Sequence, residues 1–115
     1  MGSRQDPDRE DPPEAVGRIF SAARAAADEL DEAVRWYEAQ RPGLGAEFYD
    51  AIREALALIA EHEEAGTSVG RDPRTRRLLV TRFPYQIVYR LTATETVILA
   101  FAHLKRRPGY WRDRA

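Results

Sequence analysis

The fold of this 115-residue chain is decided by RRLLVTRFPYQIVYRLTATETVILAFAH, residues 76–103. Apolar and polar side chains alternate along this stretch with a period of two, which is typical of β-strands. Pro84 would remove a hydrogen bond inside a strand, so the first reversal is placed there, and a polar turn follows at 92–95. The stretch therefore predicts three antiparallel strands, at 76–83, 85–92 and 96–103, and the last is apolar on both faces, as a central strand would be.

Two amphipathic helices are predicted upstream. Apolar side chains recur at helical spacing in residues 21–40, where Ser21 is a suitable N-cap, and again in residues 44–64. The short RPGLG turn at 41–45 makes them an antiparallel hairpin. With a short strand at 15–20 before the hairpin, the order is β-α-α-β-β-β. This order predicts an α+β two-layer fold, an antiparallel sheet with the helical hairpin packed on one face and the other face partly open.

Polar segments mark the domain boundaries. Residues 1–14, MGSRQDPDREDPPE, hold five acids and three prolines and no large apolar side chain except Met1, so we expect a disordered acidic extension. Residues 67–75 are also polar and turn-like, and are expected to form a loop. A chain of 115 residues supports one hydrophobic core, so residues 15–115 are expected to be a single domain.

Composition excludes several classes of protein. There is no cysteine and there are two histidines, which excludes a disulfide scaffold and argues against a metal centre. No phosphate-binding loop or Ser/His/Asp order is present, so no cofactor is expected. Apolar runs are too short to span a membrane, and the acidic N-terminus lacks the apolar region of a signal peptide. A cytoplasmic protein without a membrane partner is expected.

Charge is divided unevenly along the chain. Residues 1–66 carry 7 Arg and 16 Asp or Glu, whereas residues 67–115 carry 11 Lys or Arg and 3 Asp or Glu. The basic half is either a surface for nucleic acid or an acidic partner, or the complement of the acidic half within the fold.

The C-terminal stretch HLKRRPGYWRDR, residues 103–114, is the densest cluster of polar and aromatic residues. Arginines interleaved with rings are typical of single-stranded RNA recognition, although a solvated tail has a similar composition. Trp36 lies a quarter turn off the apolar stripe of the first helix, where it is either a lid over a loop or a partner contact. The candidate partner-binding residues are Trp36, Arg90, Lys105, Arg106, Arg107, Trp111 and Arg112.

A catalytic role is considered for three residues. His103 ends the last strand and could exchange protons near neutral pH, while Arg82 and Tyr110 could support metal-free RNA cleavage. The alternative for His103 is a structural ring bonded to backbone at the strand end. For Arg82 and Arg90 the alternatives are a basic patch or ion pairs with the acidic helices.

Three segments, in this order, carry a family resemblance: WYEAQRPGLGAEF at 36–48, RFPYQIVY at 82–89 and AFAHLKRRPGYWRDR at 100–114. Together they resemble the RelE/ParE superfamily of bacterial type II toxin–antitoxin toxins, closest to its ParE-like branch, over about residues 15–114. Six residues match the family's patterns by position: Arg82, His103, Arg107, Pro108, Trp111 and Arg114.

The resemblance implies a small toxin that a cognate antitoxin silences by wrapping across it, in a hetero-oligomer. ParE-like members inhibit DNA gyrase, whereas RelE-like members cut messenger RNA on the ribosome without a metal. Lys105 is the only lysine, so the lysine-rich catalytic set of the ribosome-dependent nucleases is missing. The first hypothesis is therefore growth arrest by gyrase inhibition. A metal-independent, ribosome-associated mRNA endoribonuclease, with catalytic His103, Arg82 and Tyr110, is the second, and an inactive relic that binds only its antitoxin is the third.

Overall fold

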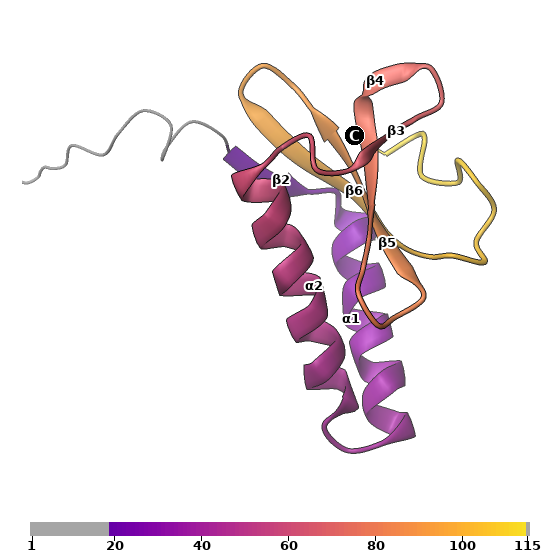
Figure 1. Cartoon of the computed structure of the whole chain (residues 1–115). Coiled ribbons are helices and arrows are strands. Elements are labelled where there is room, and N and C mark those ends of the chain that lie inside the picture. Colours follow the sequence, from indigo (N-terminus) through magenta and orange to yellow (C-terminus); the bar gives the residue numbers. More distant parts are fainter. Residues whose placement is uncertain (1–18, 115) are drawn as a thin grey trace, which may run out of the picture.

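The computed structural model describes residues 19–114, so the extension predicted at 1–14 and most of the strand predicted at 15–20 lie outside it. The described elements are β2 (Ile19–Ala22), α1 (Arg24–Gln40), α2 (Leu44–Glu61), β3 (Thr67–Val69), β4 (Asp72–Leu79), β5 (Tyr85–Leu91) and β6 (Glu95–His103). One sheet in the order β2-β6-β5-β4-β3 carries the helical hairpin on one face (Figure 1). The predicted α+β two-layer fold is confirmed.

The sheet is mixed and not antiparallel throughout. Strands β3, β4, β5 and β6 pair antiparallel in sequence order, as predicted. The first strand, β2, instead runs parallel to β6, with Ile19 opposite Glu95 and Ala22 opposite Ile98. Parallel neighbours need a long crossover connection, and the helical hairpin followed by the other strands supplies it.

Several predicted boundaries shift for local reasons. Helix α1 begins at Arg24 after an Ala23 N-cap, because Ser21 lies in β2 and its hydroxyl donates to Glu95 at 2.8 Å. The segment expected to be a loop at 67–75 forms β3 and the start of β4, which pair with each other. Strand β4 ends at Leu79, so Arg82 lies in the turn before β5.

The main core fills the space between the helices and the sheet. Helix α2 contributes large side chains such as Phe48 and Ile52, whereas α1 buries only Ala26 and Ala33. Small residues on α1 let that helix lie close to its neighbours. In β5, Ile87 and Tyr89 face this core while Val88 faces away from it, which confirms the period-two alternation predicted for that strand.

The other face of the sheet is covered by the C-terminal segment, residues 104–114, and is less open than expected. Trp111 packs there in a second apolar cluster with Val88, Leu99, Ala100 and Ala102. A β-bulge makes this possible: Val88 pairs with Ala100 and Tyr89 with Ile98, which leaves Leu99 as the extra residue. In Figure 1 the segment runs along the side of the sheet away from the helices.

Candidate functional site

A part-buried carboxylate joins helix α1 to the C-terminal segment. Glu29 accepts hydrogen bonds from the Tyr110 hydroxyl at 2.7 Å, from Arg114 at 2.9 Å and from the Phe101 backbone N–H at 3.1 Å. Arg106 lies 3.9 Å from the same carboxylate. Arg114 also donates to the Leu99 carbonyl at 3.0 Å. We call Glu29 with these donors the Glu29 clasp, and it holds the C-terminal segment against the fold.

The clasp determines the state of Tyr110. Burial, then the hydrogen bond to Glu29 and the negative charge of that carboxylate, raise the pKa of Tyr110 well above its usual value. The Arg106 guanidinium lies 3.8 Å from the centre of the Tyr110 ring, and that of Arg114 lies 5.0 Å from it. Tyr110 is therefore a neutral hydrogen-bond donor that is already engaged, which does not favour the acid–base role considered for it.

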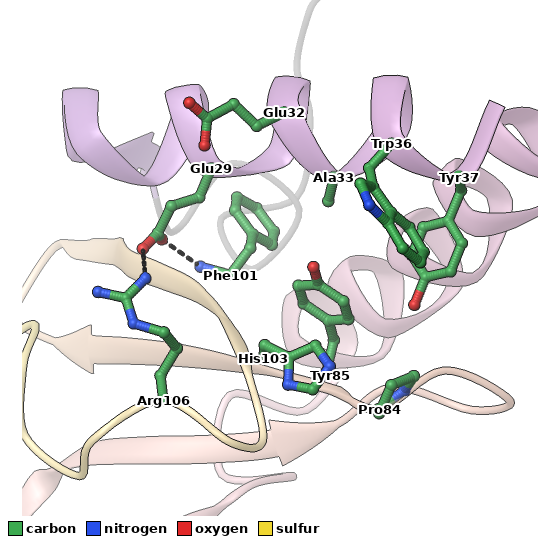
Figure 2. A pocket seen from close by; sticks show the side chains of 10 residues that line it. All are labelled: Glu29, Glu32, Ala33, Trp36, Tyr37, Pro84, Tyr85, Phe101, His103 and Arg106. Carbon is green, nitrogen blue, oxygen red and sulfur yellow. Dashed lines mark hydrogen bonds and ion pairs between the residues drawn. The ribbon is translucent and has the colours of Figure 1, made fainter. Parts of the chain in front are cut away.

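An open cleft of about 550 Å³ lies between helix α1 and the ends of β5 and β6 (Figure 2). Glu29 and Arg106 meet at one end, and Trp36 and Tyr37 project from α1 at the other. The Trp36 side chain is 60% exposed. We call this the helix–sheet cleft, and its lining residues are Glu29, Glu32, Ala33, Trp36, Tyr37, Pro84, Tyr85, Phe101, His103 and Arg106.

His103 forms part of the wall of this cleft, with a backbone hydrogen bond on one ring nitrogen. Its Nδ1 accepts from the Lys105 backbone N–H at 3.0 Å, and its ring stands edge-on to Tyr85 at 5.2 Å between centroids. A ring that accepts at Nδ1 and is neutral carries its proton on Nε2. This geometry matches the structural alternative given for His103. Within the described residues, no carboxylate hydrogen-bonds to this ring.

Arg82 is engaged elsewhere. Its guanidinium donates to Glu47 of α2 at 3.0 Å, and Arg41 pairs with the same carboxylate at 3.3 Å. The hydrogen bond from Arg82, followed by that from Arg41, holds the pKa of Glu47 below its usual value. The backbone of Arg82 has φ 78°, a left-handed conformation that is uncommon for a residue with a side chain. The ion-pair alternative therefore describes Arg82 in this structure.

A second cavity, of about 330 Å³, lies on the far face of the sheet. We call it the arginine pocket. Its lining residues are Val69, Arg77, Gln86, Val88, Ala102, His103, Leu104, Arg106, Arg107, Pro108, Gly109, Tyr110, Trp111 and Arg112.

The structure thus separates the candidate partner-binding residues. Arg106, Arg107, Trp111 and Arg112 meet at the arginine pocket, whereas Trp36 lines the helix–sheet cleft. Trp111 is only 6% exposed, so its ring packs in the fold and offers little surface to a partner. Lys105 is exposed in the turn after β6, and Arg90 lies beside Thr75 with 3.4 Å between its Nε and the Thr75 hydroxyl.

Glu29 is the residue that the sequence analysis missed. It lies three residues after Ala26 and four before Ala33, the two buried alanines of α1. A carboxylate on the buried stripe of a helix needs hydrogen-bond partners. The position of Glu29 on this stripe could therefore have identified it as a residue that binds another part of the chain. Within residues 19–114, no group of three or more His, Cys, Asp or Glu could hold a metal, and no helix is long and apolar enough to cross a membrane.

Two of three comparisons with known proteins give a match. A search of curated proteins gives no match. A solved chain described as "Chromosomal ParDE TA system from P. aeruginosa" superposes with a TM-score of 0.65 at 21% identity, covering 76% of this chain and 96% of that one, which shows a shared fold. The family model described as "ParE toxin of type II toxin-antitoxin system, parDE" matches residues 21–108. The chain therefore belongs to the ParE toxin family of type II toxin–antitoxin systems.

Proposed function

We propose that this ParE-family toxin arrests bacterial growth by inhibiting DNA gyrase through protein contact in the cytoplasm. A cognate antitoxin neutralises it by forming a toxin–antitoxin hetero-oligomer. The family match supports the toxin assignment. The choice of gyrase over messenger RNA rests on the chemistry of the candidate residues.

The observation that carries this choice is the separate engagement of the three candidate catalytic residues. Arg82 pairs with Glu47, Tyr110 donates to Glu29, and His103 accepts from backbone. Metal-free RNA cleavage needs a base, an acid and a cation around one phosphate. His103 and Tyr110 both line the arginine pocket, but each is already held by a different partner, and Arg82 lies outside that pocket. This arrangement favours inhibition by contact over cleavage.

The helix–sheet cleft offers a surface for protein contact. Its exposed Trp36 stands at the rim above an apolar wall formed by Tyr37 and Tyr85. Tryptophan is enriched among the residues that dominate binding energy at protein interfaces. A partner segment that places an apolar side chain in this cleft would bury Trp36, and we assign this role to the antitoxin.

A supercoiling assay with the purified full-length toxin and gyrase tests the proposal. We expect inhibition that rises with toxin concentration and is reversed by the antitoxin. We expect the same inhibition from His103→Ala and Arg82→Ala, because these residues have no catalytic task in a contact mechanism. Full gyrase activity at saturating folded toxin would contradict the proposal.

Expression without antitoxin separates the alternatives in cells. Intact transcripts with altered plasmid supercoiling are expected here. Transcripts cut within coding regions, and protected by His103→Ala, would support the mRNA endoribonuclease. Normal growth with the folded protein present would support the inactive relic.

A further inference from the structure

The arginine pocket is a cationic cavity with no carboxylate in its lining. Four arginines and His103 line the pocket together with the apolar side chains of Val88, Ala102 and Trp111, and Gln86 and Tyr110 are uncharged polar residues of the same lining. The helix–sheet cleft, in contrast, has Glu29 and Glu32 in its wall. A cavity lined by guanidinium groups without acids has an anion as its natural ligand.

The pocket arginines differ in how far they are already engaged. Within residues 19–114, no carboxylate lies within ion-pair distance of Arg107 or Arg112, and both arginines are exposed. Arg77 donates to the Gln86 side-chain oxygen at 3.2 Å, which orients its guanidinium without neutralising it. Arg106 is the exception, because it faces Glu29. Three uncompensated cations thus remain for a ligand.

The C-terminal segment gives the pocket a built wall. Gly109 has φ 81°, and a Cβ at this position would overlap the Arg112 guanidinium. The Arg112 guanidinium, at the far end of an exposed side chain, thus lies directly against Gly109 in this structure. Arg112 lies between Tyr110 and Arg114 in the sequence, and both of these neighbours donate part-buried hydrogen bonds to Glu29. These hydrogen bonds hold the backbone of the pocket wall in place.

Neither of the two large aromatic rings at this pocket is free to stack on a base. Trp111 is buried under the segment, and the Tyr110 ring already lies against the guanidinium groups of Arg106 and Arg114. Sequence-specific RNA recognition depends on exposed rings or on groups that read base edges. The pocket therefore suits phosphate groups better than unpaired bases.

Positive and negative charges also lie on different sides of the molecule. The two helices, residues 24–61, carry 4 Arg and 9 Asp or Glu, whereas residues 67–114 carry 11 Lys or Arg and 3 Asp or Glu. Because the helices cover one face of the sheet and the C-terminal segment covers the other, the pocket lies on the basic side. A polyanion is therefore attracted to the side with the pocket and repelled by the acidic side that the helices form.

We propose that the arginine pocket binds the phosphate backbone of duplex DNA without reading its sequence. The choice of DNA rests on the proposed function, because a toxin that contacts gyrase meets the DNA on which gyrase acts. Arg77, Arg107 and Arg112 would each contact a phosphate, and DNA contact would retain the toxin at its target.

Fluorescence anisotropy with a labelled duplex of about 20 base pairs and the full-length toxin, without gyrase, tests this directly. Three phosphate contacts predict that affinity falls about 40-fold as salt rises from about 50 to about 200 mM. Arg107→Ala and Arg112→Ala should each weaken binding and lower the slope of log affinity against log salt by about one. Arg53→Ala removes one exposed arginine from α2 and is the matched control, with binding unchanged.

Three results would overturn the proposal. The first is that wild-type toxin does not bind the duplex at low salt. The second is that Arg53→Ala loses as much affinity for the duplex as Arg107→Ala and Arg112→Ala do. The third is tighter binding to single-stranded RNA of the same length, with the same dependence on Arg107 and Arg112. A poly-glutamate peptide that binds through these arginines when DNA does not would assign the pocket to an acidic protein segment instead.

The outcome is separable from that of the proposed function. Toxin that inhibits supercoiling but does not bind the duplex would disprove the DNA-binding pocket and leave gyrase inhibition standing. Toxin that binds the duplex through Arg107 and Arg112 but never inhibits gyrase would disprove gyrase inhibition and leave the DNA-binding pocket standing.

Discussion

The helix–sheet cleft and the arginine pocket share His103 and Arg106 in their linings but differ in chemistry. The cleft has an apolar wall, two carboxylates and the exposed Trp36. The pocket has four arginines and no carboxylate. One small domain thus presents an apolar surface on its helical side and a cationic surface on the opposite side of its sheet.

One segment contributes to both surfaces, and a single carboxylate holds it in place. The C-terminal segment walls the arginine pocket, and Arg106 from this segment reaches the cleft. Glu29 accepts hydrogen bonds from Tyr110 and Arg114 in the second half of this segment, and Arg106 near its start lies beside the same carboxylate. Changes in the clasp should therefore affect both surfaces, whereas changes at Trp36 should affect only the cleft.

The largest effect is expected from Glu29→Gln. The substitution removes the charge that Arg114 faces and leaves part-buried donors with an incomplete set of acceptors. We expect a loss of about 3 kcal/mol in the free energy of unfolding, measured by urea denaturation. In a Trp36→Phe background the remaining tryptophan is Trp111, so its emission should shift to the red as the segment loosens.

Glu32→Gln is the matched control for the clasp. Glu32 lies about one turn further along α1 in the wall of the same cleft, but it is exposed. Its replacement should change stability by less than about 0.5 kcal/mol. Equal losses in the two variants would show that Glu29 has no special role in joining the two surfaces.

Trp36→Ala should separate the two surfaces. We expect affinity for the antitoxin to fall about 10- to 100-fold, as for a tryptophan central to an interface, while DNA binding at the arginine pocket is unchanged. Titration calorimetry measures the first and anisotropy the second. Tyr49→Ala, an exposed aromatic residue of α2 outside the cleft, is the control. A similar loss in that variant would remove the cleft from the antitoxin interface.

Alkaline pH should weaken the pocket wall through Tyr110. The pKa of Tyr110 is raised in the fold by burial and by Glu29, so its stabilising contribution is fully present below about pH 10, where an unfolded tyrosine titrates. That contribution is lost as pH rises from there toward the folded-state pKa. Urea midpoints from about pH 8 to pH 11 should therefore fall more steeply for wild type than for Tyr110→Phe. Parallel curves would show that the phenol is not part of the clasp in solution.

The smallest effect is expected in the turn beside the cleft. Arg82→Gly and Arg82→Ala both lose the pair with Glu47, but only glycine adopts φ 78° without strain. We expect the glycine variant to be the more stable by about 1 kcal/mol in urea denaturation. Equal stabilities would mean that the turn relaxes when the arginine is removed.

Regular elements with strong periodicity were predictable. The helical hairpin, the strands β5 and β6 and the reversal at Pro84 follow from local patterns of apolar residues and from a missing backbone donor. The parallel pairing of β2 was not, because a four-residue strand carries no signal for its direction. The short strand β3 was missed for a related reason: its Thr67–Val69 segment becomes a strand only by pairing with β4.

The sites were predictable only in part. The arginine-rich C-terminal stretch was visible in the sequence, yet the fold buries Trp111, engages Tyr110 and leaves Arg107 and Arg112 exposed. Residue type indicates which contacts a side chain can make. Burial and partners depend on chain segments that meet after folding.

Local sequence patterns were enough to predict the layers of this protein, the family to which it belongs and the concentration of positive charge in residues 67–114. The contacts of Glu29, from the first helix, with residues more than 70 positions away depend instead on how the folded chain packs. Periodicity and turn chemistry act between residues that are neighbours along the chain. A part-buried carboxylate instead accepts hydrogen bonds from whichever donors the packed fold places around it, however far away they are in the sequence.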